Sequence, residues 1–260
     1  MGLSNWIKNT QSRFRSEPIT KAVQTSLWDL VDGLWRRVQY VWLSRIGHHL
    51  NQGYSTTLAG EHVEFVTVDL TDITRAKTAL GEERVLEWLM AGIDSDCVFW
   101  DIGAYRGTYS IVAAVKGATT IAFEPQADNM AIIRDNALLN GVTIDDREVA
   151  LSDSTTSRQF YSHDRDSEFR IDSSGDQSIR TYRGDQVSPK PDVIKIDVEG
   201  HESAVLDGMD TVLPSIRRIV IEVHNDDEVR DIEERLTTAG LNVIEIPTDR
   251  PQTYVAAVNS

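Results

Sequence analysis

Short apolar runs alternate with amphipathic segments along most of the chain beyond residue 96. The runs are mostly apolar, as expected of strands buried on both faces of a parallel sheet. They predict strands at residues 97–102, 119–124, 147–151, 192–197 and 217–223. Helical periodicity fills most of the intervals and predicts helices at 107–115, 127–140, 202–213 and 226–239. This alternation indicates an α/β fold whose sheet is doubly wound and mostly parallel, with right-handed crossovers.

Three other parts of the chain depart from this alternation. Residues 62–68 predict a lead-in strand and residues 81–91 a short helix, both ahead of the regular part. The C-terminal runs LNVIEI and TYVAAV are separated by a turn containing two prolines, so we expect an antiparallel hairpin at the sheet edge. Residues 152–187 are polar and serine-rich with strand-like fragments, and we interpret them as an insertion over the ligand-binding face.

The first 50 residues differ from the rest of the chain in charge and pattern. Apolar residues recur at helical spacing over residues 19–50, and three tryptophans fall seven apart along one edge of that face, at Trp28, Trp35 and Trp42. Residues 1–50 contain seven Lys or Arg and three acidic residues, a net charge of +4. Because the whole chain carries −15, residues 51–260 carry −19. Such a helix either packs on the main domain or a second subunit, or lies peripherally at an anionic membrane surface. We therefore divide the chain into an amphipathic extension (1–50), a lead-in strand and helix (51–95) and the main α/β domain (96–260).

The overall charge of −15 argues against a nucleic-acid partner, because phosphate binding requires clustered Lys and Arg. Lysine supplies only six of the 26 basic residues, and this arginine-rich acidic composition is typical of proteins from a high-salt cytoplasm. No stretch of 18 apolar residues and no signal-peptide core is present, so we expect a cytoplasmic protein, either free or held peripherally at the inner membrane face through residues 19–50. The single cysteine, Cys97, excludes an internal disulfide and is expected in the core.

A glycine turn joins the first strand of the main domain to its helix, in the sequence DIGAYRG. A dinucleotide-binding turn has the spacing G-x-G-x-x-G, which lets a pyrophosphate approach backbone N–H groups at the helix start. Here Gly103 and Gly107 are four apart, and Asp101 precedes them. Asp101 would repel a pyrophosphate but attract an ammonium or sulfonium group, which favours S-adenosylmethionine over NAD. Glu124, 23 residues further on, can accept hydrogen bonds from both hydroxyls of a ribose.

A second group of acidic residues follows the fourth strand of the main domain, in the sequence VIKIDVEGHE. Asp197, Glu199 and Glu202 lie near the carboxyl end of that strand, where open parallel sheets bind their ligands. Acidic residues at a helix start can also be solvent-exposed and merely favour the helix dipole. Because these follow a buried strand, we place them in the ligand crevice.

Five sequence motifs occur in a characteristic order across residues 97–224: DIGAYRGTYS, AFEPQADNMAIIRDNALLN, VALSD, IKIDVEGHE and IEVH. In this order they resemble the FkbM family of S-adenosylmethionine-dependent methyltransferases. The resemblance implies a Rossmann-like, class I methyltransferase fold, S-adenosylmethionine as the cofactor and a methyl-transfer reaction. The first 60 residues lie outside it.

The same resemblance implies a role for individual residues. The methionine end of the cofactor would be surrounded by the turn residues Asp101, Gly103, Ala104 and Gly107. Glu124 would hold the ribose, and the adenine would be bordered by Ala150, Leu151 and Ser152. The acceptor would be faced by Asp197, Glu199 and Glu202, with Glu222 and His224 after the fifth strand.

Two positions depart from the family pattern, which usually has asparagine where Tyr105 stands and a small residue where His201 stands. Tyrosine fits a left-handed backbone less well than asparagine, so either the backbone is ordinary at Tyr105 or this residue is specialised. We interpret His201 as an exposed helix residue rather than an extra site residue.

The resemblance points to O-methylation of a hydroxyl group. Because a neutral hydroxyl is a poor nucleophile, a side chain must accept its proton. His224 and Asp197 are the candidate acceptors, with Glu222 orienting the histidine. A divalent metal on Asp197, Glu199 and Glu202 would be another way to lower the pKa of the hydroxyl. We expect no metal, because acids close in sequence need not converge in space.

The predicted activity is methyl transfer to a hydroxyl of a sugar or glycan precursor. A lipid-linked acceptor would account for the basic, tryptophan-striped N-terminal segment, and the absence of a PPY-type motif disfavours a nucleic-acid acceptor. The alternatives are a methyltransferase of another small-molecule metabolite, a non-catalytic nucleotide-binding scaffold and an NAD-dependent enzyme.

Overall fold

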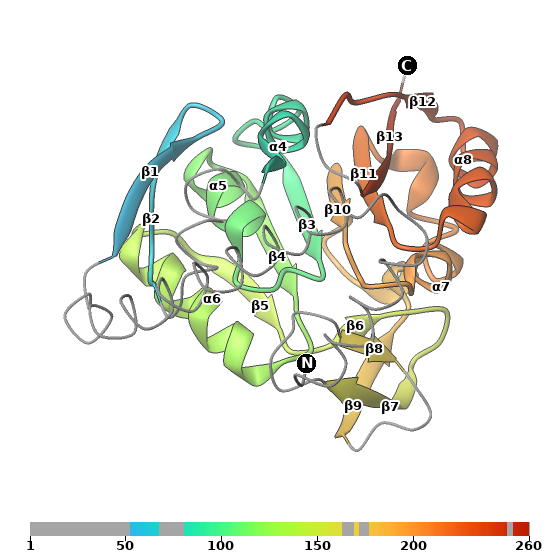
Figure 1. Cartoon of the computed structure of the whole chain (residues 1–260), viewed down its shortest axis with the longest axis horizontal. Helices are drawn as coiled ribbons and strands as arrows, with labels where there is room; N and C mark the ends of the chain where they lie inside the picture. Colours follow the sequence, from blue (N-terminus) through green and yellow to red (C-terminus); the bar gives the residue numbers. More distant parts are fainter. Residues whose placement is uncertain (1–52, 68–80, 163–168, 172–176, 249–251, 260) are drawn as a thin grey trace, which may run out of the picture. The chain divides into compact units, whose positions relative to one another are not determined.

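A seven-stranded central sheet organises the fold, with the strand order β12-β13-β11-β10-β3-β4-β5 (Figure 1). The computed structural model describes residues 53–67, 81–162, 169–171, 177–248 and 252–259, so the amphipathic segment 1–50 lies outside the described residues. The strands are β3 (Val98–Ile102), β4 (Thr119–Phe123), β5 (Ile144–Arg147), β10 (Val193–Ile196), β11 (Arg218–Val223), β12 (Asn242–Ile244) and β13 (Thr253–Val258). Neighbours from β11 to β5 are parallel, whereas β13 runs antiparallel to both β11 and β12. The mostly parallel sheet and the C-terminal edge hairpin are thus confirmed.

Helices cover both faces of this sheet and divide the interior into two cores (Figure 1). They are α4 (Glu83–Met90), α5 (Thr108–Val115), α6 (Ala127–Leu139), α7 (Glu202–Asp207) and α8 (Val229–Thr238). The first three pack into one core and the last two into the other. Side chains alternate along β3, where Phe99 enters the first core and Trp100 enters the second, because successive strand residues face opposite sides. Cys97 is fully buried in the first core, as predicted.

The lead-in segment is a hairpin rather than a single strand. β1 (Tyr54–Leu58) pairs antiparallel with β2 (Glu61–Phe65). Ala59 and Gly60 form the turn with positive φ angles of 47° and 83°, the backbone form that two-residue hairpins prefer. The side chain of Asn140, just past α6, accepts a hydrogen bond of 2.8 Å from the Glu64 N–H in β2. The prediction missed β1 because its alternating, polar residues give little apolar signal.

The run predicted as one strand at 147–151 is divided between two sheets. β5 ends at Arg147 in the central sheet, and β6 (Ala150–Leu151) begins a four-stranded sheet with the order β6-β9-β7-β8. The break is a tight turn in which the Val149 N–H donates to the Arg147 carbonyl at 2.8 Å. The remaining strands are β7 (Thr156–Ser162), β8 (Phe169–Ile171) and β9 (Gln177–Tyr182), all within the predicted insertion. The prediction was therefore right for β6 but wrong for β5, whose residues IDDR are mostly polar and share only Arg147 with the predicted strand.

The helix predicted at 202–213 is shorter in the structure, since α7 ends at Asp207. Gly208 follows it and passes so close to the preceding sheet that a Cβ there would lie 2.0 Å from the Ser152 carbonyl oxygen. The later residues form a separate 3-10 turn at Leu213–Ser215. Close backbone contact, which a helical pattern does not reveal, stops this helix early.

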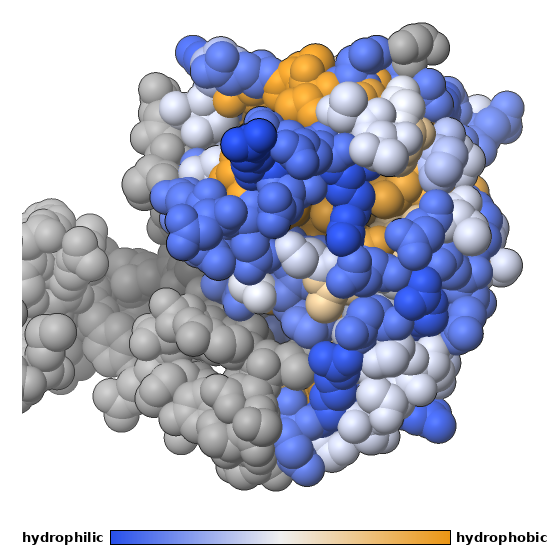
Figure 2. All heavy atoms as spheres, turned by 90° about the vertical axis from the view of Figure 1, so that its right-hand side faces the viewer, coloured by the Kyte–Doolittle hydropathy of each residue, from blue (hydrophilic) through white to orange (hydrophobic). Residues whose placement is uncertain are grey.

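The side of the molecule at the right of Figure 1 is shown in Figure 2, where hydrophilic side chains cover most of the surface and apolar residues form smaller patches between them. This fits a chain with 41 acidic and 26 basic residues. Within the described ranges, no helix has both the length and the apolar character needed to cross a membrane.

Candidate active site

A cavity lies at the carboxyl ends of β3, β4 and β10, the edge at which open α/β sheets bind ligands. After β3 and β4 it is lined by Ile102, Gly103, Tyr105, Phe123, Glu124 and Pro125. The small sheet contributes Ala150, Leu151, Phe160 and Ile179, and the segment after β10 contributes Asp197, Val198, Glu199 and His201. Residues far apart in the sequence thus share one cavity.

Gly103 stands where two strand ends approach most closely. Its φ is +78°, and its N–H donates to the Phe123 carbonyl at 3.0 Å. A Cβ at this position would lie only 1.7 Å from the Asp197 carbonyl oxygen. Only glycine can occupy the position while β3 and β10 end this close together.

Asp101 lies beneath the turn rather than in the cavity wall. Its Oδ2 accepts hydrogen bonds from the Ser110 N–H (2.9 Å) and hydroxyl (2.6 Å) in α5. Its Oδ1 has no hydrogen-bond partner in the described part of the chain, and burial raises the pKa of the carboxyl group despite the nearby positive charge of Lys195. We expected Asp101 beside the positive end of the cofactor, whereas in the structure it holds the start of α5.

The other predicted turn residues, Gly107 and Ala104, shape the backbone of the turn rather than line the cavity. Gly107 precedes α5 at φ +83°, and a Cβ there would meet the Ile133 side chain at 3.1 Å. Ala104 is buried, and its carbonyl accepts the Gly107 N–H at 2.8 Å. Of the four residues expected around the methionine end, only Gly103 lines the cavity.

Tyr105 has the left-handed backbone that its side chain disfavours, with φ of 50°. Its N–H donates to Glu124 Oε2 at 2.9 Å, and Glu124 Oε1 accepts the Gln126 N–H at 2.9 Å. Glu124 is 4% exposed, and burial raises its pKa to about 7, although these hydrogen bonds act in the opposite direction. The strained turn and the predicted ribose-binding carboxylate therefore form one unit at the cavity.

The predicted adenine border is apolar. Ala150 and Leu151 of β6 line the cavity together with Phe160 of β7 and Ile179 of β9. The sequence analysis missed Phe160 and Ile179 because they are isolated apolar residues in a polar segment that contains none of the family motifs. Alternation in TSRQFYS and QSIRTY was the available signal, since it places one side of each strand inward.

Ser152 is fully buried outside the cavity wall and contacts His201. The Ser152 hydroxyl and His201 Nε2 are 2.9 Å apart. His201 itself lines the cavity, which corrects its interpretation as an exposed helix residue. Burial lowers the His201 pKa, and the positive charge of Arg158 lowers it further, so the ring is neutral at pH 7.

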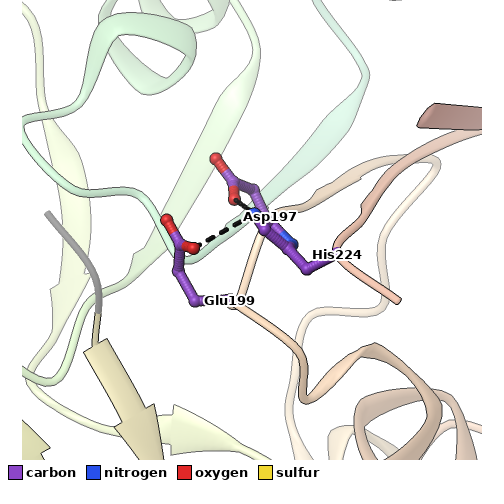
Figure 3. A group of neighbouring side chains, drawn as sticks. All are labelled: Asp197, Glu199 and His224. Atoms are coloured by element: carbon purple, nitrogen blue, oxygen red, sulfur yellow. Dashed lines mark ion pairs between the residues drawn. The ribbon is translucent and has the colours of Figure 1, made fainter. Parts of the chain in front are cut away.

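The predicted acceptor-facing residues converge on His224, as Figure 3 shows for two of them. His224 Nε2 lies 3.2 Å from Glu199 Oε2 and 3.8 Å from Asp197 Oδ1. Asp197 and Glu199 follow β10, and His224 follows the neighbouring strand β11, so parallel pairing brings them to the same sheet edge. The potential metal-ligand set here is Asp197, Glu199 and His224, in which His224 replaces Glu202 of the set considered from the sequence.

Two further carboxylates surround the same imidazole from inside the fold. Glu202 is buried, and its Oε1 lies 2.7 Å from His224 Nδ1. Glu222 Oε1 is 3.9 Å from Nε2, while its Oε2 accepts the Tyr254 hydroxyl at 3.1 Å. Glu202, expected to face the acceptor, instead orients the histidine, the task that we assigned to Glu222.

These carboxylates control the protonation of their cationic neighbours. Burial acts to lower the His224 pKa, but the Glu202 hydrogen bond and the charges of Glu199 and Asp197 raise it to about 9. Lys195 Nζ lies 3.0 Å from Asp197 Oδ2, and the same balance raises the Lys195 pKa. Both groups carry positive charge at neutral pH.

A doubly wound sheet with a cavity at its carboxyl edge is the architecture of α/β enzymes that bind a nucleotide-like cofactor, and the family match below identifies this one as an S-adenosylmethionine-dependent methyltransferase. The chain belongs to the FkbM methyltransferase family, because residues 101–241 match the Methyltransferase FkbM domain, a span of 141 of its 260 residues. The predicted family, fold class, cofactor and enzymatic nature are therefore confirmed.

One related protein is the hexuronic acid methyltransferase AglP of Haloferax volcanii, which is 28% identical over 205 residues, covering 76% of this chain and 85% of AglP. Among solved structures, precorrin-6y C5,15-methyltransferase of Geobacter metallireducens is 19% identical with a TM-score of 0.45, over 68% of this chain and 88% of that one. Magnesium protoporphyrin IX methyltransferase of Synechocystis with bound SAM is 15% identical with a TM-score of 0.45, over 75% of this chain and 86% of that one.

The affinity for S-adenosylhomocysteine is expected to rise about tenfold between pH 6 and pH 8, because Glu124 changes from mostly protonated to mostly ionised around its pKa of about 7. Hydroxyl groups of a ribose favour the ionised carboxylate, so binding lowers this pKa and releases a proton. Titration calorimetry across this range tests the expectation. Glu124→Gln should remove most of the pH dependence and Glu148→Gln, at an exposed position, should keep it; an unchanged slope in Glu124→Gln would refute the assignment.

Proposed function

We propose that this enzyme transfers the methyl group of S-adenosylmethionine to a hydroxyl of a sugar, and that the acceptor is a sugar acid in a glycan precursor. The observation that carries the proposal is the convergence of Asp197, Glu199 and His224 beside the cofactor cavity. Carboxylates and an imidazole can bind sugar hydroxyls and take up a proton from one of them. The relative that methylates hexuronic acid supports this acceptor class.

Methyl transfer is an in-line displacement in which the acceptor oxygen bonds to the methyl carbon as the carbon–sulfur bond breaks. The positive charge on sulfur disappears, so alignment and exclusion of water supply much of the rate. The hydroxyl proton must pass to a base, and of the two candidates we favour Asp197. The raised pKa keeps His224 protonated at neutral pH, which suits it to donate a hydrogen bond to the acceptor or to hold the carboxylates in place.

A thermal melt in high salt tests the cofactor, and a transfer assay tests the acceptor. S-adenosylhomocysteine should raise the melting temperature, whereas NAD should not. Labelled methyl donor should then transfer its methyl group to sugar-acid glycolipids or activated sugar acids. No stabilisation by S-adenosylhomocysteine would indicate a non-catalytic scaffold, stabilisation by NAD alone would indicate a dehydrogenase, and label only in other small molecules would refute the sugar acceptor.

A lipid-linked acceptor is the finer form of the proposal, and it depends on residues 1–50. Their net +4 charge and tryptophan stripe favour contact with anionic lipid. Deleting residues 1–50 is therefore expected to move the enzyme from the membrane fraction to the supernatant of a cell lysate. Substituting Asp29 and Asp32 by Asn should strengthen membrane association, since both carboxylates oppose it. Unchanged fractionation of the deletion variant would remove the membrane link.

A further inference from the structure

The cluster around His224 has the donor spacing of a metal site. One donor atom from each of Asp197, Glu199 and His224 lies within 4.8 Å of the others. The distances from His224 Nε2 are 3.2 Å to Glu199 and 3.8 Å to Asp197. Adjacent ligands of a cation with bonds near 2.1 Å are separated by about 3 to 3.5 Å. The distance from Nε2 to Glu199 already falls in this range, and the wider separations would close by side-chain movement when a cation binds.

The histidine is also oriented as metal-binding histidines are. Its Nδ1 lies 2.7 Å from Glu202 Oε1, which directs Nε2 toward Asp197 and Glu199. Metal-ligating histidines almost always donate their other ring N–H to a carboxylate, carbonyl or water. A carboxylate on the far side of the ring is therefore a feature separate from the donor cluster itself.

Glu202 has a second feature that a bound cation would favour. The residue is 0% exposed, its Oε1 accepts the Gly200 N–H at 3.0 Å, and its Oε2 has no hydrogen-bond partner within the described residues. A buried carboxylate oxygen without a partner is costly, and positive charge nearby offsets that cost. This oxygen shares a carboxyl group with the one that contacts His224 Nδ1, so a cation at Nε2 would act on it through the imidazole, from the far side of the ring.

The position of the cluster leaves part of a cation's coordination sphere for a ligand. Asp197 and Glu199 line the cavity, so open coordination positions would face the acceptor, as in catalytic metal sites. Four carboxylates, Asp197, Glu199, Glu202 and Glu222, lie within 4 Å of the imidazole and repel one another. A sugar acid would add another negative charge, which a divalent cation attracts.

We propose that Asp197, Glu199 and His224 bind one divalent cation, with Glu202 positioning the histidine. The cation would take the place of the proton on His224 Nε2, so the imidazole donates a hydrogen bond to the acceptor only when no cation is bound. One imidazole nitrogen and two carboxylate oxygens suit Mn²⁺, and Mg²⁺ or Zn²⁺ can compete for such a set. When bound, the cation would polarise an acceptor hydroxyl and lower its pKa. This last role depends on the proposed function, whereas cation binding itself does not.

Mn²⁺ binding to the full chain, freed of metal by EDTA and held in high potassium chloride, tests the site by electron paramagnetic resonance and calorimetry. We expect one tightly bound Mn²⁺ per chain. His224→Asn should weaken binding at least tenfold, and Glu202→Gln should weaken it by about 10- to 100-fold through loss of ring orientation. Asp231→Asn, at an exposed position on α8, should leave the affinity unchanged within twofold.

Two results would overturn the proposal: no bound Mn²⁺ at millimolar concentration, or equal weakening in His224→Asn and Asp231→Asn, which would mean diffuse attraction to an acidic surface. Each variant is also melted with S-adenosylhomocysteine to verify that it is folded. A wild-type enzyme that is stabilised by S-adenosylhomocysteine but binds no Mn²⁺ would refute the cation site and leave the methyltransferase activity intact.

Discussion

Replacing Gly103 by alanine is expected to abolish stabilisation by S-adenosylhomocysteine and to lower the melting temperature sharply. The new Cβ would lie 1.7 Å from the Asp197 carbonyl oxygen, and that atom belongs to the backbone after β10. Relief requires β3 and β10 to separate at their carboxyl ends, where the cofactor turn and the acidic cluster meet. Circular dichroism and a melt with and without S-adenosylhomocysteine measure the two effects.

Gly141→Ala is the matched control for backbone strain. Gly141 also has a positive φ, of +64°, but a Cβ there meets nothing within 4 Å. This variant should lose only about 1–2 kcal/mol of stability, the usual cost of a left-handed backbone at a residue with a side chain, and should bind S-adenosylhomocysteine normally. If Gly103→Ala behaved like Gly141→Ala in both measurements, the close approach of the two strand ends would not be a requirement of this enzyme.

Replacing Asp197 by asparagine is expected to lower kcat by about 10²- to 10⁴-fold, the usual effect of losing a positioned proton acceptor. Affinity for S-adenosylhomocysteine should change by less than about threefold, because the ribose and adenine walls lie elsewhere in the cavity. The melting temperature should also fall, since Lys195 is 7% exposed and loses the carboxylate at 3.0 Å.

Single-turnover methyl transfer on folded Asp197→Asn protein separates the chemical step from binding. Asp231→Asn removes the same charge from an exposed position on α8 and should retain wild-type kcat. A folded Asp197→Asn enzyme with a rate within threefold of wild type would exclude Asp197 from the chemical step and leave Glu199 as the candidate proton acceptor, since His224 is already protonated at neutral pH.

Most of the parallel strands were predictable from the sequence because burial on both faces makes them largely apolar, as in VIKI of β10 and RIVIEV of β11, where single charged residues interrupt the apolar run. β1 was not, since its YSTTL residues alternate between exposed and partly buried positions. β5 was also missed, because its IDDR residues are mostly polar and only Arg147 falls within the strand predicted at 147–151.

The residues of the candidate site were also only partly predictable from the sequence. The sequence placed Glu124 and the turn around Gly103 at the ligand edge, since both end strands that lie next to each other. It did not show that Asp101 is buried against Ser110, because adjacency to a glycine turn does not reveal which face of the strand a side chain occupies. The sequence also did not show which carboxylate contacts the His224 ring. Glu202 and Glu222 were both candidates, and only the packing of the fold brings Glu202 within 2.7 Å of Nδ1.

The sequence by itself determined the doubly wound fold, the family and the cofactor, because strand burial and ligand-contacting turns leave local, ordered patterns of residues. Only the tertiary structure decided that Phe160 and Ile179 line the cavity, that Tyr105 has a left-handed backbone and donates to Glu124, and that His224 joins Asp197 and Glu199. These features depend on distances between segments far apart in the chain. Such distances follow from how the whole sheet and its insertion pack, which no single stretch of sequence encodes.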